Sequence, residues 1–290
     1  MEYFEGKTVL LTGSTSGLGK SLLFILSRVR TCKIVITGRS PEKLSCLSRQ
    51  LKDSLATIKT AELDLESPDR EIDECISSIF KIHGVVNVAF NCAGMGFRGR
   101  VIETLGDVDR RVMQVDYFGQ RAVIKSLLKR WEESGCASWD IVQVSSVQGY
   151  IGIGERASYA AAKHALIGFV DSLRVEFDEY PKRSMRRVMH VCPGYIATNH
   201  SVNSIRGDGT VYAEQDASTL SGFSPEYVAQ RMLDGCVRGD REMIICDRGV
   251  RILLWIRALF PGLGFRILRN KYMGVKESIM VTVFKWLFSV

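Results

Sequence analysis

Short apolar runs alternate with amphipathic segments along most of the chain. Apolar or β-branched runs that end in a polar break predict β-strands, at 8–11, 33–37, 61–64, 85–90, 140–144, 185–191 and 242–246. Apolar residues at three- to four-residue spacing predict helices between them, at 17–29, 41–55, 68–83, 108–131, 157–178 and 225–238. Strands that alternate with helices in this way predict an α/β fold with a doubly wound parallel sheet of about seven strands.

A polar or charged residue follows the carboxyl end of five of these strands. The five residues are Thr12, Arg39, Asp64, Asn91 and Ser146. The carboxyl ends of parallel strands meet at one edge of the sheet, where open α/β sheets bind their ligands. One polar residue at a strand end carries little information, but five in succession predict a ligand site at this edge.

A glycine-rich loop joins the first strand to the first helix. The loop and the start of the helix consist of Thr12, Gly13, Ser14, Thr15, Ser16, Gly17, Leu18 and Gly19. Glycines let the backbone turn tightly and approach a pyrophosphate, and the first turn of the helix offers free N–H groups to it. A glycine loop between the first strand and the first helix predicts a dinucleotide-binding domain of the Rossmann type.

Arg39 follows the second strand, at the position where such folds choose between NAD and NADP. An acidic residue there would bind the ribose 2′-hydroxyl of NAD, but this sequence has Gly38 followed by Arg39. A guanidinium suits a 2′-phosphate, so the sequence favours NADP over NAD. The alternative is an ordinary solvated arginine on the surface.

Ser146, Tyr159 and Lys163 are the candidates for the chemistry. Tyr159 and Lys163 are four residues apart in a predicted helix, so their side chains lie one turn apart on the same face. An ammonium lowers the pKa of a neighbouring phenol because it favours the phenolate. A serine hydroxyl beside them can hydrogen-bond a carbonyl oxygen. Together they predict an acid–base site that protonates a carbonyl during reduction, or the reverse, although a Tyr-x-x-x-Lys pair alone is a common coincidence.

Length and composition fit one large α/β domain at 1–247 and a basic, apolar segment at 248–290. The 290 residues are 46% hydrophobic, which is enough for a substantial core. The net charge of +7 resides in the C-terminal segment, which contains no acidic residue between Arg248 and Lys276. Proteins that bind nucleic acid more often spread basic residues over their main domain, so no nucleic-acid partner is expected.

The eight cysteines are scattered, with neither a C-x-x-C pair nor paired histidines. This pattern favours a reducing compartment and predicts no metal site.

Two apolar runs of the C-terminal segment, 251–260 and 279–290, are shorter than the ~18–20 uncharged residues that span a bilayer. Their tryptophans and basic residues fit a helix that lies in the membrane interface. The alternative is a helix that covers the substrate cleft or forms a dimer contact, and a lid over a lipid site would be compatible with both. The amino terminus is short and polar, so neither a signal peptide nor a membrane span is expected there.

These motifs together resemble the short-chain dehydrogenase/reductase family over roughly residues 5–247. They are the glycine loop, the turn from Asn91 to Gly94, Ser146, Tyr159 with Lys163, and Pro193-Gly194 with Thr198. The resemblance implies that Ser146 polarises the carbonyl and Tyr159 donates the proton. It implies that Lys163 lowers the pKa of the tyrosine and binds the nicotinamide ribose. It further implies cofactor contacts by Asp64, Leu65, Asn91, Ala93, Gly94, Pro193, Gly194, Ile196 and Thr198.

One branch of that family shares further motifs with this chain, at 107–113, 117–119, 145–149, 193–196, 201–203 and 224–225. The resemblance implies NADPH-dependent reduction of acyl- or alkyl-dihydroxyacetone phosphate in ether-lipid synthesis. It also implies a membrane-associated protein on the cytoplasmic face of the endoplasmic reticulum or peroxisome, the alternative being the cytoplasm. No amino-terminal anchor like that of these relatives is expected, so membrane contact would come from elsewhere. Relatives often form homodimers through the helices that correspond to 108–131 and 157–178.

Asp116 departs from the family pattern. The family usually has asparagine at this position, where it helps to bind a water of the proton relay. An ionised carboxylate accepts hydrogen bonds but cannot donate them, and its charge favours the ammonium form of Lys163. We count Asp116 among the catalytic residues and expect a relay that is slowed but not abolished.

Two other functions are compatible with the sequence. The first is a steroid or retinoid oxidoreductase of the same family, which would not need a basic residue for a phosphate. Within the polar segment 201–223, which we expect to form a flap, Arg206 is the basic candidate for that role. The second is a cofactor-binding scaffold whose relay has decayed at Asp116, against which the intact Ser146, Tyr159 and Lys163 argue.

Overall fold

The computed structural model describes residues 1–178 and 186–275. Seven strands form one sheet in the order β3-β2-β1-β4-β6-β7-β9, and every neighbouring pair is parallel. The strands are β1 Thr8–Thr12, β2 Lys33–Gly38, β3 Thr57–Glu62, β4 Val88–Asn91, β6 Trp139–Val144, β7 Arg186–Pro193 and β9 Glu242–Ile245. The predicted doubly wound α/β fold is confirmed. Because β1 lies between β2 and β4, the strand order reverses at β1, where such sheets open a ligand crevice.

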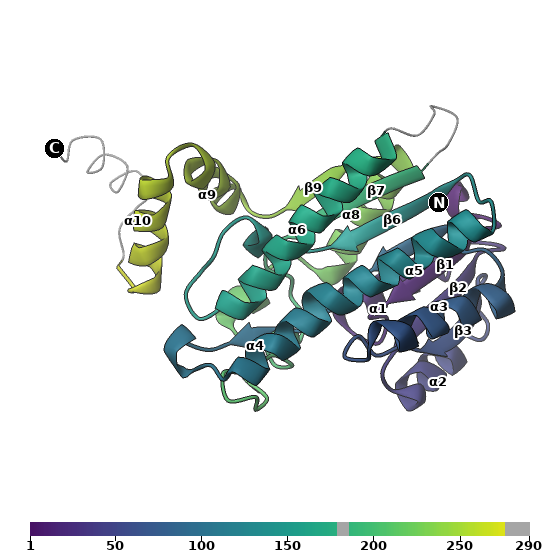
Figure 1. Ribbon diagram of the computed structural model, residues 1–290, viewed down its shortest axis with the longest axis horizontal. Coiled ribbons are helices and arrows are strands. Elements are labelled where there is room, and N and C mark those ends of the chain that lie inside the picture. The colour runs from purple at the N-terminus through teal and green to yellow at the C-terminus, as the bar shows by residue number, and fades with distance from the viewer. Residues whose placement is uncertain (179–185, 276–290) are drawn as a thin grey trace.

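Helices cover both faces of the sheet (Figure 1). One core lies between the sheet and the helices α1 Gly17–Leu26, α2 Pro41–Gln50 and α8 Pro225–Arg238. The other core lies under α3 Asp69–His83, α4 Gly106–Met113, α5 Gly119–Glu133 and α6 Ala157–Asp178. Within β4, Val88 and Phe90 belong to the first core and Ala89 to the second. A strand that is buried on both faces has no polar alternation, which is why such strands appear in the sequence as continuous apolar runs.

The predicted third strand was misplaced. The sequence analysis expected it at 61–64, whereas β3 spans Thr57–Glu62. This strand lies at the edge of the sheet, pairs only with β2, and has no fully buried residue. β3 has neither a continuous apolar run nor a fully buried face. The hydrophobic pattern that located the central strands is therefore missing here. Asp64 still follows the carboxyl end of β3.

The predicted helix at 108–131 is interrupted. α4 is followed by a π-helical turn at Gln114–Phe118, and α5 begins at Gly119. A Cβ on Gly119 would approach the backbone oxygen of Leu65 to 2.4 Å, so a glycine lets the helix pass this loop closely. π-turns inside α-helices are frequent at functional sites, and this one contains Asp116.

The polar segment 201–223 has more structure than the sequence indicates. β8 Ile205–Arg206 pairs in parallel with β5 Phe97–Arg98, and α7 spans Ala217–Leu220. Short 3₁₀ turns lie at Glu2–Phe4, Val101–Glu103 and Val147–Gly149. We call residues 199–223 the flap, because they extend from the end of β7 over the carboxyl edge of the sheet and return to α8.

α9 Arg248–Leu259 and α10 Pro261–Tyr272 form a helical pair beyond one end of the sheet (Figure 1). Leu253, Leu263 and Ile267 pack with Ile151, which follows β6, in a small cluster separate from the two main cores. The predicted apolar helix at 251–260 is therefore present, begins at Arg248, and continues into a second helix. The predicted run at 279–290 lies outside the described residues. Across the described residues, no helix combines the length and apolar character needed to cross a membrane.

Candidate active site

A cleft of about 950 Å³ runs along the carboxyl edge of the sheet. Most residues predicted for the site line it: Thr12, Gly13, Ser16, Gly17, Leu18, Gly19, Arg39, Asp64, Leu65, Ala93, Gly94, Ser146, Tyr159, Lys163, Pro193, Gly194, Ile196 and Thr198. Ser14, Asn91 and Asp116 are buried and do not line the cleft. The cleft thus joins the glycine loop at one end to the candidate acid–base group and the flap at the other.

The glycine loop passes too close to its neighbours for side chains at two positions. Gly13 has φ +67°, and a Cβ there would lie 2.7 Å from the Cα of Ala93. A Cβ on Gly19 would lie 2.3 Å from the backbone oxygen of Gly13. Ser14, beneath the loop, donates a hydrogen bond to the backbone oxygen of Thr37 at 3.0 Å. The loop therefore presents its backbone to the cleft, as binding of a dinucleotide pyrophosphate requires.

Thr12 and Asn91 fix the turn that follows β4. The hydroxyl of Thr12 donates to Asn91 Oδ1 at 2.8 Å and accepts the N–H groups of Cys92 and Ala93 at 3.0 and 3.2 Å. Asn91 in turn donates to Gln143 Oε1 at 2.7 Å. Asn91 therefore holds the floor of the cofactor site from below, through a buried network.

Arg39 lies at the adenosine end of the cleft, with 59% of its side chain exposed. Its guanidinium is 2.9 Å from Glu66 Oε1, and Arg111 binds both oxygens of the same carboxylate, at 2.8 and 3.0 Å. Two guanidinium groups therefore share one carboxylate beside the position where a cofactor ribose would lie. A surplus positive charge here suits a phosphate better than a hydroxyl.

Ser146, Tyr159 and Lys163 converge at the centre of the cleft. Ser146 follows β6, and its hydroxyl accepts the N–H of Gln148 at 3.1 Å. This hydrogen bond fixes the side chain of Ser146 at the start of the loop. Lys163 Nζ lies 5.4 Å from the centre of the Tyr159 ring, one turn away on α6. The hydroxyl of Ser145 donates to the backbone oxygen of Lys163 and joins the catalytic loop to α6. The structure thus brings together the three residues that the sequence singled out.

Asp116 forms a buried ion pair with Lys163. Its Oδ1 lies 3.1 Å from Lys163 Nζ and accepts the N–H of Met95 at 3.0 Å. Both side chains are almost fully buried, at 0% and 4% exposure. Asp116 Oδ2 has no hydrogen-bond partner. A Cβ on Gly94 would lie 2.8 Å from Asp116 Oδ1, so the turn after β4 covers the pair closely.

Burial and charge set the protonation of this group. Burial raises the pKa of Tyr159, and the carboxylate of Asp116 raises it further, while Lys163 lowers it. The sequence analysis expected Lys163 to lower this pKa. The lysine does act in that direction, but burial outweighs it.

Burial also raises the pKa of Asp116, against the effect of Lys163. Burial alone would lower the pKa of Lys163, but the charges of Asp116 and Tyr159 reverse the shift and raise it. Lys163 is therefore held as the ammonium.

The end of the cleft that the sequence analysis expected to hold the nicotinamide is built by the loop after β7. Gly194 donates its N–H to the backbone oxygen of Ile245 at 2.8 Å, which ties the loop to β9. Thr198 Oγ1 accepts the N–H of His200 at 3.3 Å, and Gln215 binds the backbone oxygen of Thr198. Thr198 also faces Gly17 of the glycine loop. The predicted residues of this loop thus lie opposite the start of α1.

The sequence analysis missed several residues of the cleft. His200 stands edge-on to the ring of Tyr159, with ring centroids 6.0 Å apart. His200 is exposed to the open cleft, but the surrounding protein desolvates its ring and lowers the pKa of His200 to about 4, and the charges of Arg98 and Lys163 contribute, so the ring is neutral. Arg98, from β5, and Lys271 and Tyr272, from α10, also line the cleft. No motif identified them, because they come from a two-residue strand, a flap and a terminal helix that only the fold brings to this place.

Arg206, the sequence candidate for a substrate phosphate, does not line the cleft. It pairs with Glu214 at 2.7 Å on the outer side of the flap. Among the described residues, no group of three or more histidine, cysteine, aspartate and glutamate side chains could hold a metal ion.

Known proteins are similar to this chain in sequence, and others are similar in fold. A profile of the short chain dehydrogenase family matches residues 7–208. Dehydrogenase/reductase SDR family member 7B of Mus musculus is 36% identical over 280 residues, which are 95% of this chain and 84% of that protein.

Two solved structures share the fold at low sequence identity. A short chain dehydrogenase/reductase from Burkholderia phymatum in complex with NAD has a TM-score of 0.77 at 19% identity, covering 91% of this chain and 96% of that one. A short-chain dehydrogenase from Sphingobium yanoikuyae in complex with NADPH has a TM-score of 0.68 at 20% identity, covering 93% and 94%. One of these proteins binds NAD and the other NADPH, so the fold alone leaves the choice of cofactor to the residues of this chain.

Proposed function

The chain belongs to the short-chain dehydrogenase family, whose fold binds NAD(P), and we propose that it is an NADPH-dependent reductase of a carbonyl group on a lipid-like substrate. The observation that carries the proposal is the single cleft that joins the glycine loop, the group of Ser146, Tyr159 and Lys163, and an apolar outer part. The proposed substrate class includes acyl- and alkyl-dihydroxyacetone phosphate.

Several residues of the cleft have separate roles in the proposed reduction. A bound nicotinamide supplies the hydride. Tyr159 donates its phenolic proton to the carbonyl oxygen, and Ser146 donates a hydrogen bond to the same oxygen, so negative charge does not accumulate there. Lys163 stays an ammonium because Asp116 pairs with it, and its charge stabilises the phenolate that remains on Tyr159. The alcohol carries the hydride on carbon and the tyrosine proton on oxygen, and the tyrosine is reprotonated before the next turnover.

NADPH is favoured over NADH by the charges at the adenosine end. Arg39 and Arg111 share Glu66, as described above, so a 2′-phosphate would meet a guanidinium that one carboxylate does not fully neutralise. No acidic side chain occupies the end of β2, where Gly38 is followed by Arg39. NADH would leave this arginine pair without a ligand.

The outer part of the cleft is apolar. Ile151 and Ile153 line it from the loop after β6, and Val250, Leu253 and Leu268 line it from α9 and α10. Apolar surface of this kind contributes to the binding of hydrocarbon, at about 25 cal/mol for each Å² removed from water. A substrate with a long acyl or alkyl chain fits it better than a small polar ketone. A steroid or retinoid would also bind an apolar wall, so it remains the alternative substrate class, and a non-catalytic scaffold is the third candidate.

The proposed function is tested by oxidation of NADPH, and in parallel NADH, with a panel of carbonyl compounds. The panel contains an acyl-dihydroxyacetone phosphate, a 3-oxosteroid and retinal, and the Tyr159→Phe protein is the control. We expect a higher kcat/KM with NADPH than with NADH, preference for the acyl ketone, and loss of turnover in Tyr159→Phe by about 10²-fold or more. Equal turnover in Tyr159→Phe would exclude the mechanism, and preference for steroid or retinal would favour the alternative. Cofactor binding without turnover of any compound would favour the scaffold.

The helical pair α9–α10 is the proposed site of membrane contact. Trp255, Leu259, Phe260 and Phe265 are each about half exposed or more, and the pair carries Arg248, Arg251, Arg257, Arg266, Arg269 and Lys271 without an acidic residue. Exposed aromatic and aliphatic side chains beside basic ones suit the interface of an anionic membrane. The same helices line the cleft, so a lipid substrate would enter close to the bilayer. We propose a membrane-associated location, on the cytoplasmic face of the endoplasmic reticulum or peroxisome as the sequence resemblance implies, with the cytoplasm as the alternative.

A further inference from the structure

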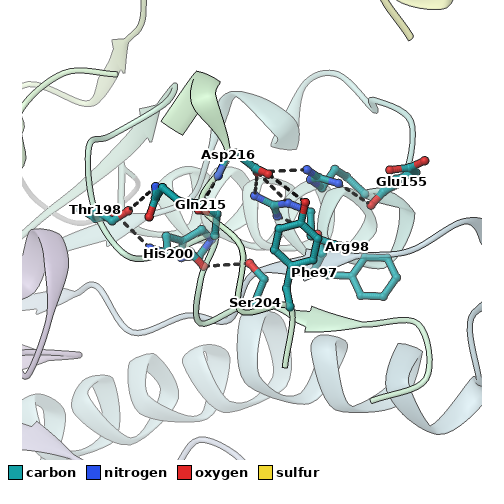
Figure 2. Close-up of polar contacts among 11 residues, drawn as sticks. Phe97, Arg98, Glu155, Thr198, His200, Ser204, Gln215 and Asp216 are labelled. Carbon is teal, nitrogen blue, oxygen red and sulfur yellow. Dashed lines mark hydrogen bonds and ion pairs between the residues drawn. The ribbon is translucent and has the colours of Figure 1, made fainter. Parts of the chain in front are cut away.

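Two arginines converge on one carboxylate at the substrate end of the cleft. Arg98 of β5 binds Asp216 of the flap through Nε at 2.9 Å and also through Nη2. Arg156, which precedes α6, reaches the same Oδ2 atom at 3.4 Å. Figure 2 shows Arg98 and Asp216 pointing toward one another between the strand and the flap. The three side chains are largely buried, at 9%, 14% and 16% exposure.

The cluster has one positive charge in excess, because two guanidinium groups share one carboxylate. Arg98 also donates a hydrogen bond to the backbone oxygen of Phe97, and Arg156 donates one to the backbone oxygen of Glu155. Neither of these acceptors is charged. Glu155 also contributes a carboxylate nearby, but it is exposed and therefore screened by solvent. Burial and the like charge of Arg98 lower the pKa of Arg156 to about 10. A buried surplus charge is costly unless a ligand compensates it.

Arg98 is the residue of the cluster that lines the cleft. Arg98 lines the cleft together with His200, Asn203 and Tyr159. It acts electrostatically on both rings, since its charge lowers the pKa of Tyr159 and of His200. Asp216 is braced within the flap, because it accepts a hydrogen bond from Tyr212 at 3.2 Å and donates its N–H to Ser201 at 3.2 Å. Arg98 and Arg156 join this braced carboxylate to parts of the chain outside the flap.

We propose that Arg98, backed by Asp216 and Arg156, is the subsite that binds an anionic oxygen group, a phosphate or a carboxylate, on the carbonyl substrate. This inference rests on the proposed reductase function and assigns to Arg98 the role that the sequence suggested for Arg206. Asp216 takes the Nε and one Nη2 N–H of Arg98, and Phe97 takes one Nη1 N–H, so the second N–H of each Nη atom is left to bind an anion. Such charge-assisted bonds are about twice as strong as neutral ones. Asp216 holds the guanidinium in place before the substrate binds, which reduces the ordering that binding requires.

The same contacts would be expected if the cluster only fastened the flap. In that case the loss of the Arg98–Asp216 pair would impair all substrates alike. A subsite for an anion would instead discriminate between substrates that differ only in the anionic group. The test therefore compares ratios between paired substrates rather than turnover of one compound.

The test uses the full chain with the double variant Arg98→Gln/Asp216→Asn, which removes the guanidinium that lines the cleft together with its carboxylate partner and retains side chains that can hydrogen-bond. The charge of Arg156, which does not line the cleft, remains. Asp216→Asn alone leaves the two guanidinium groups without their counter-charge. Arg206→Gln/Glu214→Gln is the matched control, because it neutralises an ion pair of the same flap outside the cleft. The paired substrates are acyl-dihydroxyacetone phosphate with acyl-dihydroxyacetone, and a long-chain oxo acid with its methyl ester, so that phosphate and carboxylate are tested separately.

We expect the ratio of kcat/KM between the anionic and the uncharged ketone to fall about tenfold or more in the double variant. The ratio should rise in Asp216→Asn and stay unchanged in the control. Equal losses on both ketones would overturn the proposal and identify the cluster as a fastening of the flap. An unchanged ratio would overturn it as well.

Equilibrium binding separates this inference from the proposed reductase function. Calorimetry compares dodecyl phosphate, dodecanoate and dodecanol with the same four proteins and requires no turnover. Tighter binding of an anionic ligand that is lost in the double variant supports the subsite even if no ketone is reduced. The same affinity in the native protein and the double variant would overturn the subsite while leaving a reductase possible.

Discussion

At the scale of single residues, Asp116 distinguishes this site. The sequence predicted that a carboxylate at this position would favour the ammonium form of Lys163, and the structure places the two in direct contact at 3.1 Å. Both groups are buried, so the charge of each has a strong effect on the pKa of the other. The charge of Asp116 also raises the pKa of Tyr159. A tyrosine with a raised pKa is a weaker acid, so it transfers its proton to the substrate less readily. The structure therefore supplies a physical reason for the slowed relay that the sequence suggested.

Replacement of Asp116 by asparagine is expected to raise turnover in the direction of reduction near neutral pH. Without the carboxylate, its charge no longer raises the pKa of Tyr159, so over the pH range in which Lys163 is still an ammonium the phenol becomes a stronger acid. Since reduction requires the protonated phenol, the alkaline limb of the pH profile should move to lower pH. The measurement is kcat/KM for ketone reduction as a function of pH.

Asp107→Asn is the control for this experiment. Asp107 lies on α4, before the π-turn that contains Asp116, but it is exposed and pairs with Arg110. Its replacement should leave the profile unchanged. If Asp116→Asn shows the native rate and the native alkaline limb, the carboxylate has no role in the relay.

At the scale of elements, the cleft is bounded by parts of the chain that lie outside the sheet. The flap closes one side through Asp216, and α9–α10 closes another through contacts with the loop after β6. The ring of Tyr272 lies so close to Gly154 that a Cβ there would be 2.2 Å from Cδ2. The buried part of this interface is small, consisting of Ile151, Leu253, Leu263 and Ile267. Small interfaces of this kind open more readily than the main core, so α9–α10 can admit a substrate without unfolding of the domain.

The docking of α10 is expected to depend on Leu263, which is 3% exposed. Leu263→Ala removes buried apolar contacts and should cost about 2–3 kcal/mol of docking free energy. Amide hydrogen exchange in α9 and α10 should accelerate by about 30- to 150-fold, with little change in the central strands.

Leu259→Ala is the matched control, since Leu259 is 65% exposed on α9. It should change exchange little. Equal protection of α10 in the Leu263→Ala and native proteins would show that the helical pair is held by other contacts.

At the scale of the whole molecule, charge and apolar surface are concentrated at one end. The main domain is close to electrically neutral, because the net charge of +7 resides in the C-terminal segment. The exposed apolar side chains of α9–α10 lie among these basic residues, and the Arg257 guanidinium lies 4.4 Å from the centre of the Phe265 ring. Figure 1 shows the helical pair at one end of the protein. Because residues of α9 and α10 also line the cleft, the basic apolar surface and this part of the cleft belong to the same end.

The full chain is expected to float with phosphatidylserine-containing vesicles. The double variant Trp255→Ser/Phe265→Ser should bind about tenfold less, because it removes large apolar side chains from the interface. Binding should weaken with added salt, since basic residues contribute about 1 kcal/mol each at an anionic surface.

Val101→Ser/Ile102→Ser is the control for flotation, because these two exposed apolar residues, at 75% and 86%, lie outside α9–α10. Native protein that fails to float, or variants that float equally, would exclude α9–α10 as the membrane contact.

The sequence by itself determined the sheet and the acid–base group. Central strands are buried on both faces and must be apolar, and a turn that approaches another backbone, as at Gly13, must lack a side chain. Tyr159 and Lys163 are close because helical spacing makes them so. These constraints are local, so they are legible along the chain. The limits of β3 were missed because an edge strand has no continuous apolar run.

Only the tertiary structure decided which distant residues share the cleft. Arg98 comes from β5, His200 from the flap and Tyr272 from α10, and no spacing rule relates them. Asp216 of the flap pairs with Arg98 without lining the cleft. The π-turn that aims Asp116 at Lys163 was hidden within an ordinary helical pattern. The charge of Arg206 was evident in the sequence, but its orientation away from the cleft was not. Contacts between residues far apart in the chain depend on how loops and terminal helices pack, and this packing leaves no periodic signal in the sequence.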